Sequence, residues 1–212
     1  MAAPAMTYTS LLSDIQTYAD RDDTPFVSQI PRFIMLAENK IASQVRGLGF
    51  TKVVTGTLTA TESVLTKPAR WRETISFNIG TGTSNAQRTF LKLRTYEFCR
   101  QYWPNSELTD QPIYYADYNY ENLLLVPTPD AAYPFEFIYH ERPLPLSTDN
   151  ETNWTTEYAP QLLLYGALVE AAPFLKNFEI LPMWQALYNE AASAIMKEDM
   201  ANVTDKTGRV QA

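Results

Sequence analysis

The pattern of hydrophobic and polar positions divides this chain into helical ends and a strand-rich middle. Apolar residues recur at helical spacing over residues 7–20 and again over residues 31–45, which predicts two helices near the N-terminus. Pro31 suits the first position of the second helix, because its missing N–H would have no partner there. Gly47 and Gly49 are expected to end that helix, as glycine commonly does.

From residue 50 onward the period of the pattern changes to that of strands. Residues 52–61 are rich in Val and Thr, and residues 73–79 alternate, with Ile75, Phe77 and Ile79 expected on a buried face. A short helix is predicted at residues 95–102. Further strands are predicted at residues 63–67, 88–92, 113–118, 122–126 and 133–140.

The C-terminal third predicts two more helices, at residues 156–175 and 180–200. From Pro160 to Ala172 the only charged side chain is that of Glu170. A helix that is apolar on nearly all sides must be buried on nearly all sides. We therefore expect the first of these helices to lie inside a bundle or between subunits.

These elements predict an α+β fold, in which N- and C-terminal helices form one bundle and an antiparallel β-domain is inserted between them. The expected parts are the N-terminal helices of the bundle (1–49), the β-rich domain with its short helix (50–145) and the C-terminal helices (146–200). The polar residues 201–212 are expected to form a tail that is disordered when unbound.

The charge of the chain is negative overall and unevenly distributed. A formal net charge of -7 argues against a general nucleic-acid binder. Residues 67–100, however, hold seven basic and two acidic side chains, so this segment carries +5 and the remainder -12. Such asymmetry fits complementary surfaces on neighbouring subunits, and it equally fits a solvated face of the β-domain.

Residues that carry chemistry are few. The only histidine, His140, ends an aromatic strand, and the only cysteine, Cys99, rules out an internal disulfide and is expected to act as a small hydrophobe. Zinc ligands and a glycine-rich phosphate loop are both missing from the sequence. We expect no catalytic residue, cofactor or metal, and thus a protein that is not an enzyme.

Two further groups allow more than one interpretation. The carboxylates at positions 110, 117, 121 and 130 could form a calcium site or a glycosidase pair, but their spacing matches no calcium loop and loop carboxylates are ordinarily solvated. The tyrosines at positions 114, 115, 118 and 120 form a hairpin that could stack on sugars or bases, form a cross-strand ladder or contact a subunit. The four carboxylates are Asp110, Asp117, Glu121 and Asp130, and the tyrosines are Tyr114, Tyr115, Tyr118 and Tyr120.

The sequence also bears on location. No stretch approaches the length of a membrane span, and the first residues do not read as a signal peptide. We expect a protein that is cytoplasmic where it is made and that has no membrane partner.

Three stretches of the chain carry a family resemblance. They are YTSLLSDIQTY (8–18) followed by FVSQIPRFIMLAE (26–38), then LLLVPTPDAAY (123–133), and finally YHERPLPL (139–146) with Asn153-Trp154 and LLLYGALVEA (162–171). Together they resemble the head-to-tail adaptor, or connector, proteins of tailed bacteriophages, in particular the podovirus adaptor family.

The resemblance implies a structural virion protein at the head–tail junction, assembled in the host cytoplasm. Such adaptors form a ring, expected to be a dodecamer, beneath the portal protein. The ring extends the DNA channel, carries tail or nozzle proteins and helps retain the genome until DNA ejection. The resemblance implies no cofactor, and an acidic ring suits DNA that passes without sequence-specific binding.

The resemblance and the charge pattern together predict which residues contact other proteins. In the tail, the expected portal-binding residues are Val203, Lys206, Arg209 and Val210. In the β-domain, the expected subunit or tail contacts are Lys67, Arg70, Arg72, Arg88, Arg94, Tyr115 and Tyr118. Two rival hypotheses are a tail-associated cell-wall hydrolase that uses Asp117 and Glu121, and a glycan- or receptor-binding tail module that uses the tyrosine hairpin.

Overall fold

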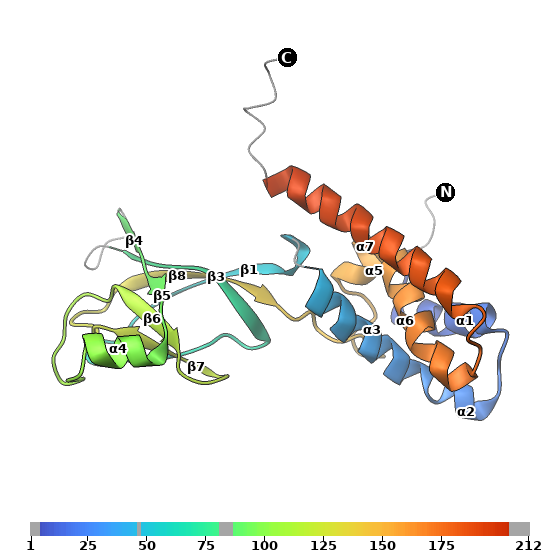
Figure 1. Ribbon diagram of the computed structural model, residues 1–212, viewed down its shortest axis with the longest axis horizontal. Coiled ribbons are helices and arrows are strands. Elements are labelled where there is room, and N and C mark those ends of the chain that lie inside the picture. Colours follow the sequence, from blue (N-terminus) through green and yellow to red (C-terminus); the bar gives the residue numbers. More distant parts are fainter. Residues whose placement is uncertain (1–4, 46–47, 81–86, 204–212) are drawn as a thin grey trace, which may run out of the picture. The chain divides into compact units, whose positions relative to one another are not determined.

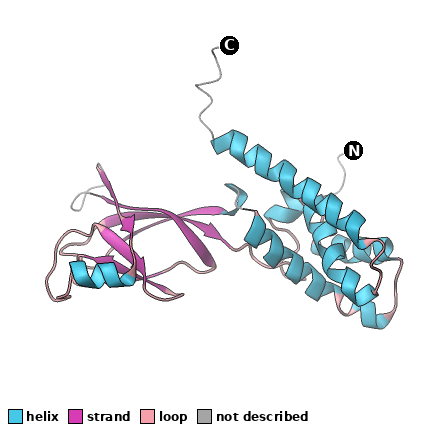
Figure 2. Ribbon diagram, viewed as in Figure 1, coloured by secondary structure: helices cyan, strands magenta, loops and turns pink. Residues whose placement is uncertain are grey.

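The computed structural model describes residues 5–45, 48–80 and 87–203, and the chain divides into two compact units. The helical unit comprises Met1–Phe50 and Arg142–Ala212, and the β unit comprises Thr51–Glu141 (Figure 1). All strands lie in the β unit, which also holds one short helix (Figure 2). The predicted α+β class, with helices from both ends of the chain and an inserted sheet region, is confirmed.

The described residues of the helical unit form one 3₁₀ turn (η1) and six α-helices. Side chains cap three of these helices: Thr7 caps α1 in a capping box with Ser10, Asp23 caps α2, and Asn153 caps α5. The elements are α1 (Tyr8–Ala19), α2 (Thr24–Val27), α3 (Ile30–Gln44), η1 (Leu48–Phe50), α5 (Trp154–Tyr158), α6 (Pro160–Leu175) and α7 (Leu181–Val203).

Two predicted helix boundaries in this unit are wrong. Helix α3 ends at Gln44, and Val45 is already extended, so the helix stops before either glycine; Gly47 itself is outside the described residues. The helix predicted at residues 156–175 is two helices, because Ala159 leaves the helical region at φ -136° and ψ 45°. Ala159 precedes Pro160, whose ring disfavours the helical conformation for the residue before it.

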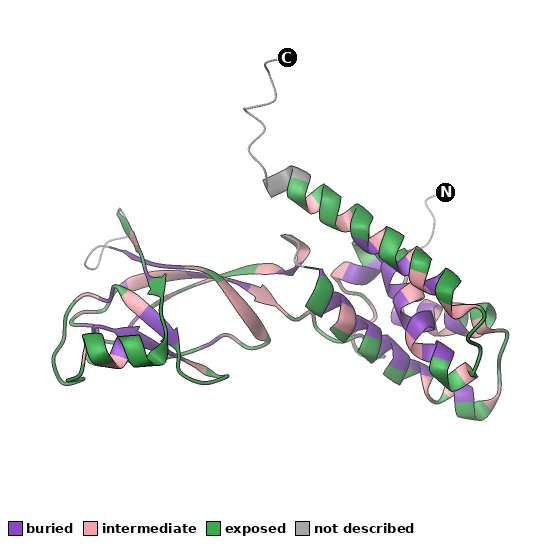
Figure 3. Ribbon diagram, in the orientation of Figure 1, coloured by how far each residue is buried: buried purple, intermediate pink, exposed green. Residues whose placement is uncertain are grey.

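Helix α6 is the centre of the helical core, as its apolar sequence predicts. Nine of its sixteen residues are buried, and it packs against α1, α3, α5 and α7 (Figure 3). At Gly166 a Cβ atom would lie 3.3 Å from the Cβ of Ala37 on α3 and 3.3 Å from Cε2 of Tyr188 on α7. The missing side chain therefore allows three helices to approach closely at one level.

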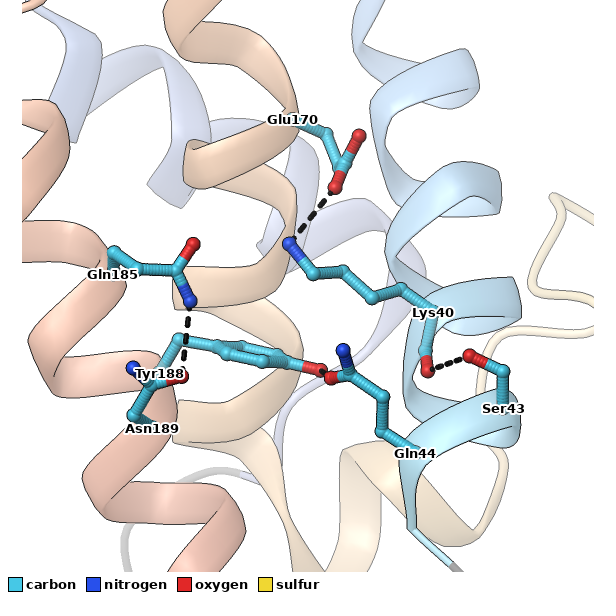
Figure 4. A network of polar contacts seen from close by, with 7 residues as sticks. All are labelled: Lys40, Ser43, Gln44, Glu170, Gln185, Tyr188 and Asn189. Atoms are coloured by element: carbon cyan, nitrogen blue, oxygen red, sulfur yellow. Dashed lines mark hydrogen bonds and ion pairs between the residues drawn. The ribbon is translucent and has the colours of Figure 1, made fainter.

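A polar network lies beside this crossing. Lys40 Nζ donates to Glu170 Oε1 at 3.1 Å and lies 5.0 Å from the centre of the Tyr188 ring. The Tyr188 hydroxyl donates to Gln44 Oε1 at 2.6 Å (Figure 4). Burial and the nearby Glu170 charge raise the pKa of Tyr188 to about 12. Glu170, the single charged residue of the apolar α6 run, thus joins α6 to α3 through its ion pair with Lys40, next to α7.

The β unit is built from two four-stranded sheets whose inner faces share one core. Phe77 and Phe137 from the first sheet pack with Tyr115, Leu123 and Leu125 from the second. The first sheet has the order β1 (Thr51–Thr57), β8 (Pro134–Glu141), β3 (Trp71–Gly80) and β4 (Arg88–Phe90). The second has the order β2 (Val64–Thr66), β7 (Asn122–Val126), β6 (Tyr114–Asp117) and β5 (Lys92–Leu93). All pairings are antiparallel except that between β5 and β6.

The alternation predicted along β3 holds for only part of the strand. Phe77 and Ile79 are buried, but Ile75 is 48% exposed. The register with β8 shifts between Thr74 and Ser76, so one extra residue interrupts the pairing at this point. Such a bulge turns the following side chains to the other face of the sheet, and this is why Ile75 does not share the face of Phe77.

A smaller core lies on the outer side of the second sheet. Helix α4 (Tyr96–Tyr102), capped by Thr95, places Cys99 against Ala116, Leu124 and Val126. Cys99 is fully buried, and burial raises the pKa of its thiol. The thiol is therefore a packing group in this unit, as its sequence context predicts.

Candidate functional site

Three of the four carboxylates that suggested a calcium or glycosidase site are engaged separately. Asp117 pairs with Lys67, Asp130 accepts the Tyr133 hydroxyl proton at 2.6 Å, and Asp110 accepts from the backbone N–H of Gln111. Over the ranges that the structure covers, no three His, Cys, Asp or Glu side chains are grouped as metal ligands would be. Neither the metal site nor the hydrolase hypothesis gains support from this arrangement.

Lys67, one of the seven predicted contacts, is buried inside the β unit. Its side chain is only 2% exposed, and its Nζ lies 2.7 Å from Asp117 Oδ1 and 2.9 Å from the carbonyl oxygen of Asn119. The same Nζ lies 3.6 Å from the centre of the Trp71 ring, on whose edge Tyr120 packs. This ammonium binds the end of β2 to the hairpin that joins β6 to β7.

Three arginines lie along the first sheet and the turn that leads into it. Arg70 pairs with Glu141 across the sheet and has a positive φ of 57°. Arg88 donates to Asn78 Oδ1 at 2.9 Å, and Asn78 in turn donates to Glu136 at 3.2 Å. Arg72 is partly exposed on β3. Arg70 and Arg88 are exposed and are also bonded to partners within the unit. Their guanidinium groups are therefore held in place on the surface.

Arg94 is part of an exposed aromatic surface around α4. Its guanidinium carbon lies 5.5 Å from the centre of the Phe98 ring and 5.6 Å from that of Tyr114. Arg100 lies 5.3 Å from the centre of the Tyr96 ring. We call this set the α4 surface: Leu93, Arg94, Tyr96, Phe98, Arg100, Tyr102 and Tyr118.

The rings of the α4 surface contact one another. Phe98 stacks on Tyr102 with the ring centres 6.0 Å apart, and both pack edge-on against Tyr114. Tyr96 lies 6.0 Å from Tyr118. Such interlocked rings form a rigid apolar patch, and exposed apolar patches of this kind mark interaction sites.

The tyrosine hairpin does not present its rings together. Tyr115 is 5% exposed and packs edge-on against Phe77 in the core, and burial raises its pKa to about 12. Tyr118 and Tyr120 are exposed, but Tyr118 packs with Tyr96 and Tyr120 with Trp71. Of the two predicted tyrosine contacts, only Tyr118 lies on a surface.

Glu38 of the helical unit is a site that sequence reasoning missed. It is 6% exposed on α3 and accepts from the backbone N–H of Leu146 at 3.2 Å and from Asn153 Nδ2 at 2.8 Å. Burial raises the pKa of this carboxyl, while the two hydrogen bonds oppose the shift. Glu38 thereby holds the segment that leads into α5, and a carboxylate among the apolar positions of α3 was the signal for it.

The predicted portal-binding residues lie at or beyond the end of α7. Val203 is the last residue of that helix. Lys206, Arg209 and Val210 are outside the described residues. Up to residue 200, the last buried residue of α7 is Ala192; Ile195 still packs against the helical core at partial burial, while Met196 and Met200 are exposed.

Among the described residues, no helix is long and apolar enough to span a membrane.

Comparison with protein families gives a match that covers nearly the whole chain. The model of a family described as SU10 adaptor protein matches residues 6–211, which is nearly the whole chain and includes both units. A search of curated proteins found none that matches.

Proposed function

The chain belongs to the SU10 adaptor protein family, and from this membership we propose that it forms a ring beneath the portal protein of a tailed phage. The predicted resemblance to phage head-to-tail adaptors is thereby confirmed. The protein is a structural component of a phage virion and associates with other virion components. In our proposal the ring is a dodecamer, extends the DNA channel and is the platform on which tail or nozzle proteins assemble.

The observation that carries this proposal is the extent of the family match. It covers residues 6–211, so the likeness includes the bundle helices from both ends of the chain and the β unit between them. The structure supports a scaffold role through its use of polar groups. Lys40, Glu170 and Lys67 join elements to one another, and groups of this kind stabilise a fold.

The charge of the chain supports the channel role. The net charge of -7 gives a ring of many copies a strongly negative total, which disfavours adhesion of DNA phosphates. We propose that the genome passes without sequence-specific binding, and that the protein acts without a cofactor or catalysis. The ring would be assembled in the host cytoplasm and would reside at the head–tail junction.

Helix α7 and the residues after it are our proposed portal contact. The exposed Met196 and Met200 follow the last buried residue of the helix, and flexible methionine side chains adapt well to a partner surface. Val203, Lys206, Arg209 and Val210 continue the same segment. A shortened chain that ends at residue 200 should keep its fold and bind the portal more weakly.

Electron microscopy of the purified chain, with and without the portal protein of the same phage, tests the proposal. We expect a twelve-fold ring, or an added layer beneath the portal. The chain that ends at residue 200, mixed with portal in the same way, is the matched control for the docking end. A monomer that leaves the portal unchanged would refute the ring function.

The basic residues of the first sheet provide a second arm of that experiment. We propose that Arg70, Arg72 and Arg88 contact a neighbouring subunit or a tail protein. Reversal of Arg70 and Arg72 to Glu should reduce assembly on the portal or attachment of the tail. The control is the double substitution of the exposed Arg32 and Lys52 to Glu, which changes the net charge by the same amount. Assembly and tail attachment at the wild-type level would remove these arginines from the interface.

A further inference from the structure

We propose that the β units of neighbouring subunits join head to tail, with the loop 104–110 of one subunit inserted into a hollow beside Arg94 of the next. This inference rests on the proposed ring and names the contact that would build it. Its two halves, a knob and a hollow, lie at opposite ends of α4 in the β unit.

The hollow is the concave part of the α4 surface. It has a volume of about 460 Å³, is shallow, and is lined by Leu93, Arg94, Thr95, Tyr96 and Asp117. Leu93 is 53% exposed and Tyr96 is 41% exposed, so an apolar floor lies open next to the Arg94 guanidinium. The Asp117 carboxylate in the lining is half exposed, but its pairing with the Lys67 ammonium offsets its negative charge beside Arg94.

The knob is the loop that follows α4. Leu108 is 58% exposed and lies between two exposed acids, Glu107 and Asp110. An apolar side chain flanked by carboxylates is the complement of an apolar hollow flanked by an arginine.

The loop is held in place by hydrogen bonds on both sides of its tip. Trp103 Nε1 donates to the Leu108 carbonyl oxygen at 3.0 Å, and Thr128 Oγ1 donates to the Ser106 carbonyl oxygen at 3.0 Å. The backbone N–H of Asp110 donates to the Thr128 carbonyl oxygen at 2.9 Å. A loop fixed in this way loses little conformational entropy when it binds, which favours a preformed contact.

The knob cannot fill the hollow of its own subunit. Leu93 and Arg94 precede α4, whereas Trp103 holds Leu108 at the other end of that helix. Seven helical residues separate the two ends by about 10 Å. Two different surfaces on one subunit make a heterologous contact, and repetition of such a contact gives a closed ring when the rotation between subunits closes, as the proposed ring requires.

A second copy of the chain is the occupant that charge favours. The β unit as a whole holds eight basic and ten acidic residues, so its net charge of -2 does not attract DNA. Around the hollow, the basic residues Lys92, Arg94 and Arg100 outnumber the acids Glu97 and Asp117. The acids of the knob supply the opposite charge from the same chain.

Cysteine cross-linking tests the contact in assembled rings. The chain has only one cysteine, Cys99, which is fully buried, so introduced thiols will dominate disulfide formation. A chain with Leu93→Cys and Leu108→Cys should give a ladder of linked subunits on a non-reducing gel after mild oxidation. The control carries Val64→Cys and Leu108→Cys: Val64 is also exposed, but it lies on β2, at the opposite edge of the same sheet from β5.

The outcomes separate this contact from the ring itself. Rings without a ladder, or equal ladders from both pairs, would overturn the contact and leave the proposed function standing. If the wild-type chain forms no ring with or without portal, the proposed function fails and the contact fails with it.

Charge reversal gives an independent test. Arg94→Glu should lower the yield of rings by about tenfold or more, and so should Glu107→Arg with Asp110→Arg. The triple variant should recover most of the wild-type yield, because the reversed charges are again complementary. All of these side chains are exposed, so the thermal unfolding of each variant should match that of the wild type. Normal rings from Arg94→Glu that no longer bind tail proteins would assign the α4 surface to the tail instead and overturn the subunit contact.

Discussion

Lys40 Nζ on α3 lies 3.1 Å from Glu170 Oε1, the one carboxylate in the apolar run of α6. Both side chains are about a quarter exposed, with relative accessibilities of 24% and 27%. The pair lies beside Tyr188, so the Lys40 ammonium also contacts the face of the Tyr188 ring. The ion pair therefore fixes the register of α3 against α6, because apolar contacts alone would allow the two helices to slide past each other.

Glu170→Gln is expected to lower the free energy of unfolding by about 1 kcal/mol, because Lys40 then loses its counter-ion while it stays partly buried. Urea unfolding of the single variants and of Lys40→Met with Glu170→Gln gives the coupling energy of the pair. The exposed Glu190 on α7, changed to Gln, controls for the loss of one acid. Additive effects of the two substitutions would show that the contact contributes no coupling.

The close packing around Gly166 limits the size of the side chain that this position can accept, where α3, α6 and α7 cross. Alanine there gains about 1 kcal/mol of helix propensity but places a methyl group 3.3 Å from Ala37 and Tyr188, so the two effects should nearly cancel. Leucine cannot be accommodated without moving a helix, and we expect Gly166→Leu to cost about 3 kcal/mol. Chemical unfolding measures both; a stable leucine variant would show that this crossing is loosely packed.

Glu38 and Glu151 predict pH dependences of opposite sign. Burial raises the pKa of Glu38, so the folded chain holds this proton to higher pH than the unfolded chain. Its contribution to stability is full below the ordinary value of 4.5 and is lost as the pH rises through the raised pKa. Hydrogen bonds from the Thr9 backbone and hydroxyl lower the pKa of Glu151, whose contribution is full above 4.5 and is lost as the pH falls through the lowered pKa.

The corresponding glutamine variants test these signs. Relative to the wild type, Glu38→Gln should gain stability as the pH rises above 4.5, whereas Glu151→Gln should lose stability as the pH rises toward 4.5. Urea unfolding at a series of pH values measures both differences. Parallel curves for the two variants would contradict the assigned causes of the shifts.

Substitutions at Lys67 and at Arg94 are expected to have different effects: the first should lower stability, and the second should reduce ring assembly. Lys67→Met keeps the length of the buried side chain but removes its ion pair with Asp117 and its contact with the Trp71 face, at a cost of about 1–2 kcal/mol. Arg94→Glu should leave the unfolding midpoint unchanged and reduce ring formation. Thermal unfolding and electron microscopy of both variants provide the comparison; a loss of rings in folded Lys67→Met would mean that the ammonium reaches a partner after all.

Local signals in the sequence predicted the elements well. The helix expected over residues 31–45 and the burial of α6 depend on residues close together in the chain, and both are found in the structure, the former at Ile30–Gln44. The bulge at Ile75 was not predictable, because it depends on pairing with β8 more than fifty residues later. The same holds for the order of strands in the two sheets.

The candidate contacts were harder to predict than the fold, because exposure is set by tertiary structure. Lys67 belongs to a basic segment in the sequence, but Asp117 and Asn119, which lie far along the chain, enclose its ammonium. Tyr115 and Tyr118 are three residues apart, yet one ring points into the core and the other lies on the surface. Leu108 was not predicted as a contact, because a single leucine among polar residues can be either buried or exposed, and the sequence does not distinguish the two.

The antiparallel pairing of β1 with β8 changes how the helical unit can fold. Thr51 lies opposite His140, so the chain leaves and re-enters the β unit on adjacent strands, about 5 Å apart. The contacts between α3 and α6 span all of that intervening chain, and closing so long a flexible loop would carry a large entropic cost. Once β1 and β8 have paired, the effective loop is only the gap between two neighbouring strands. The pairing of β1 with β8 thus shortens the effective loop that contacts between the bundle helices must close.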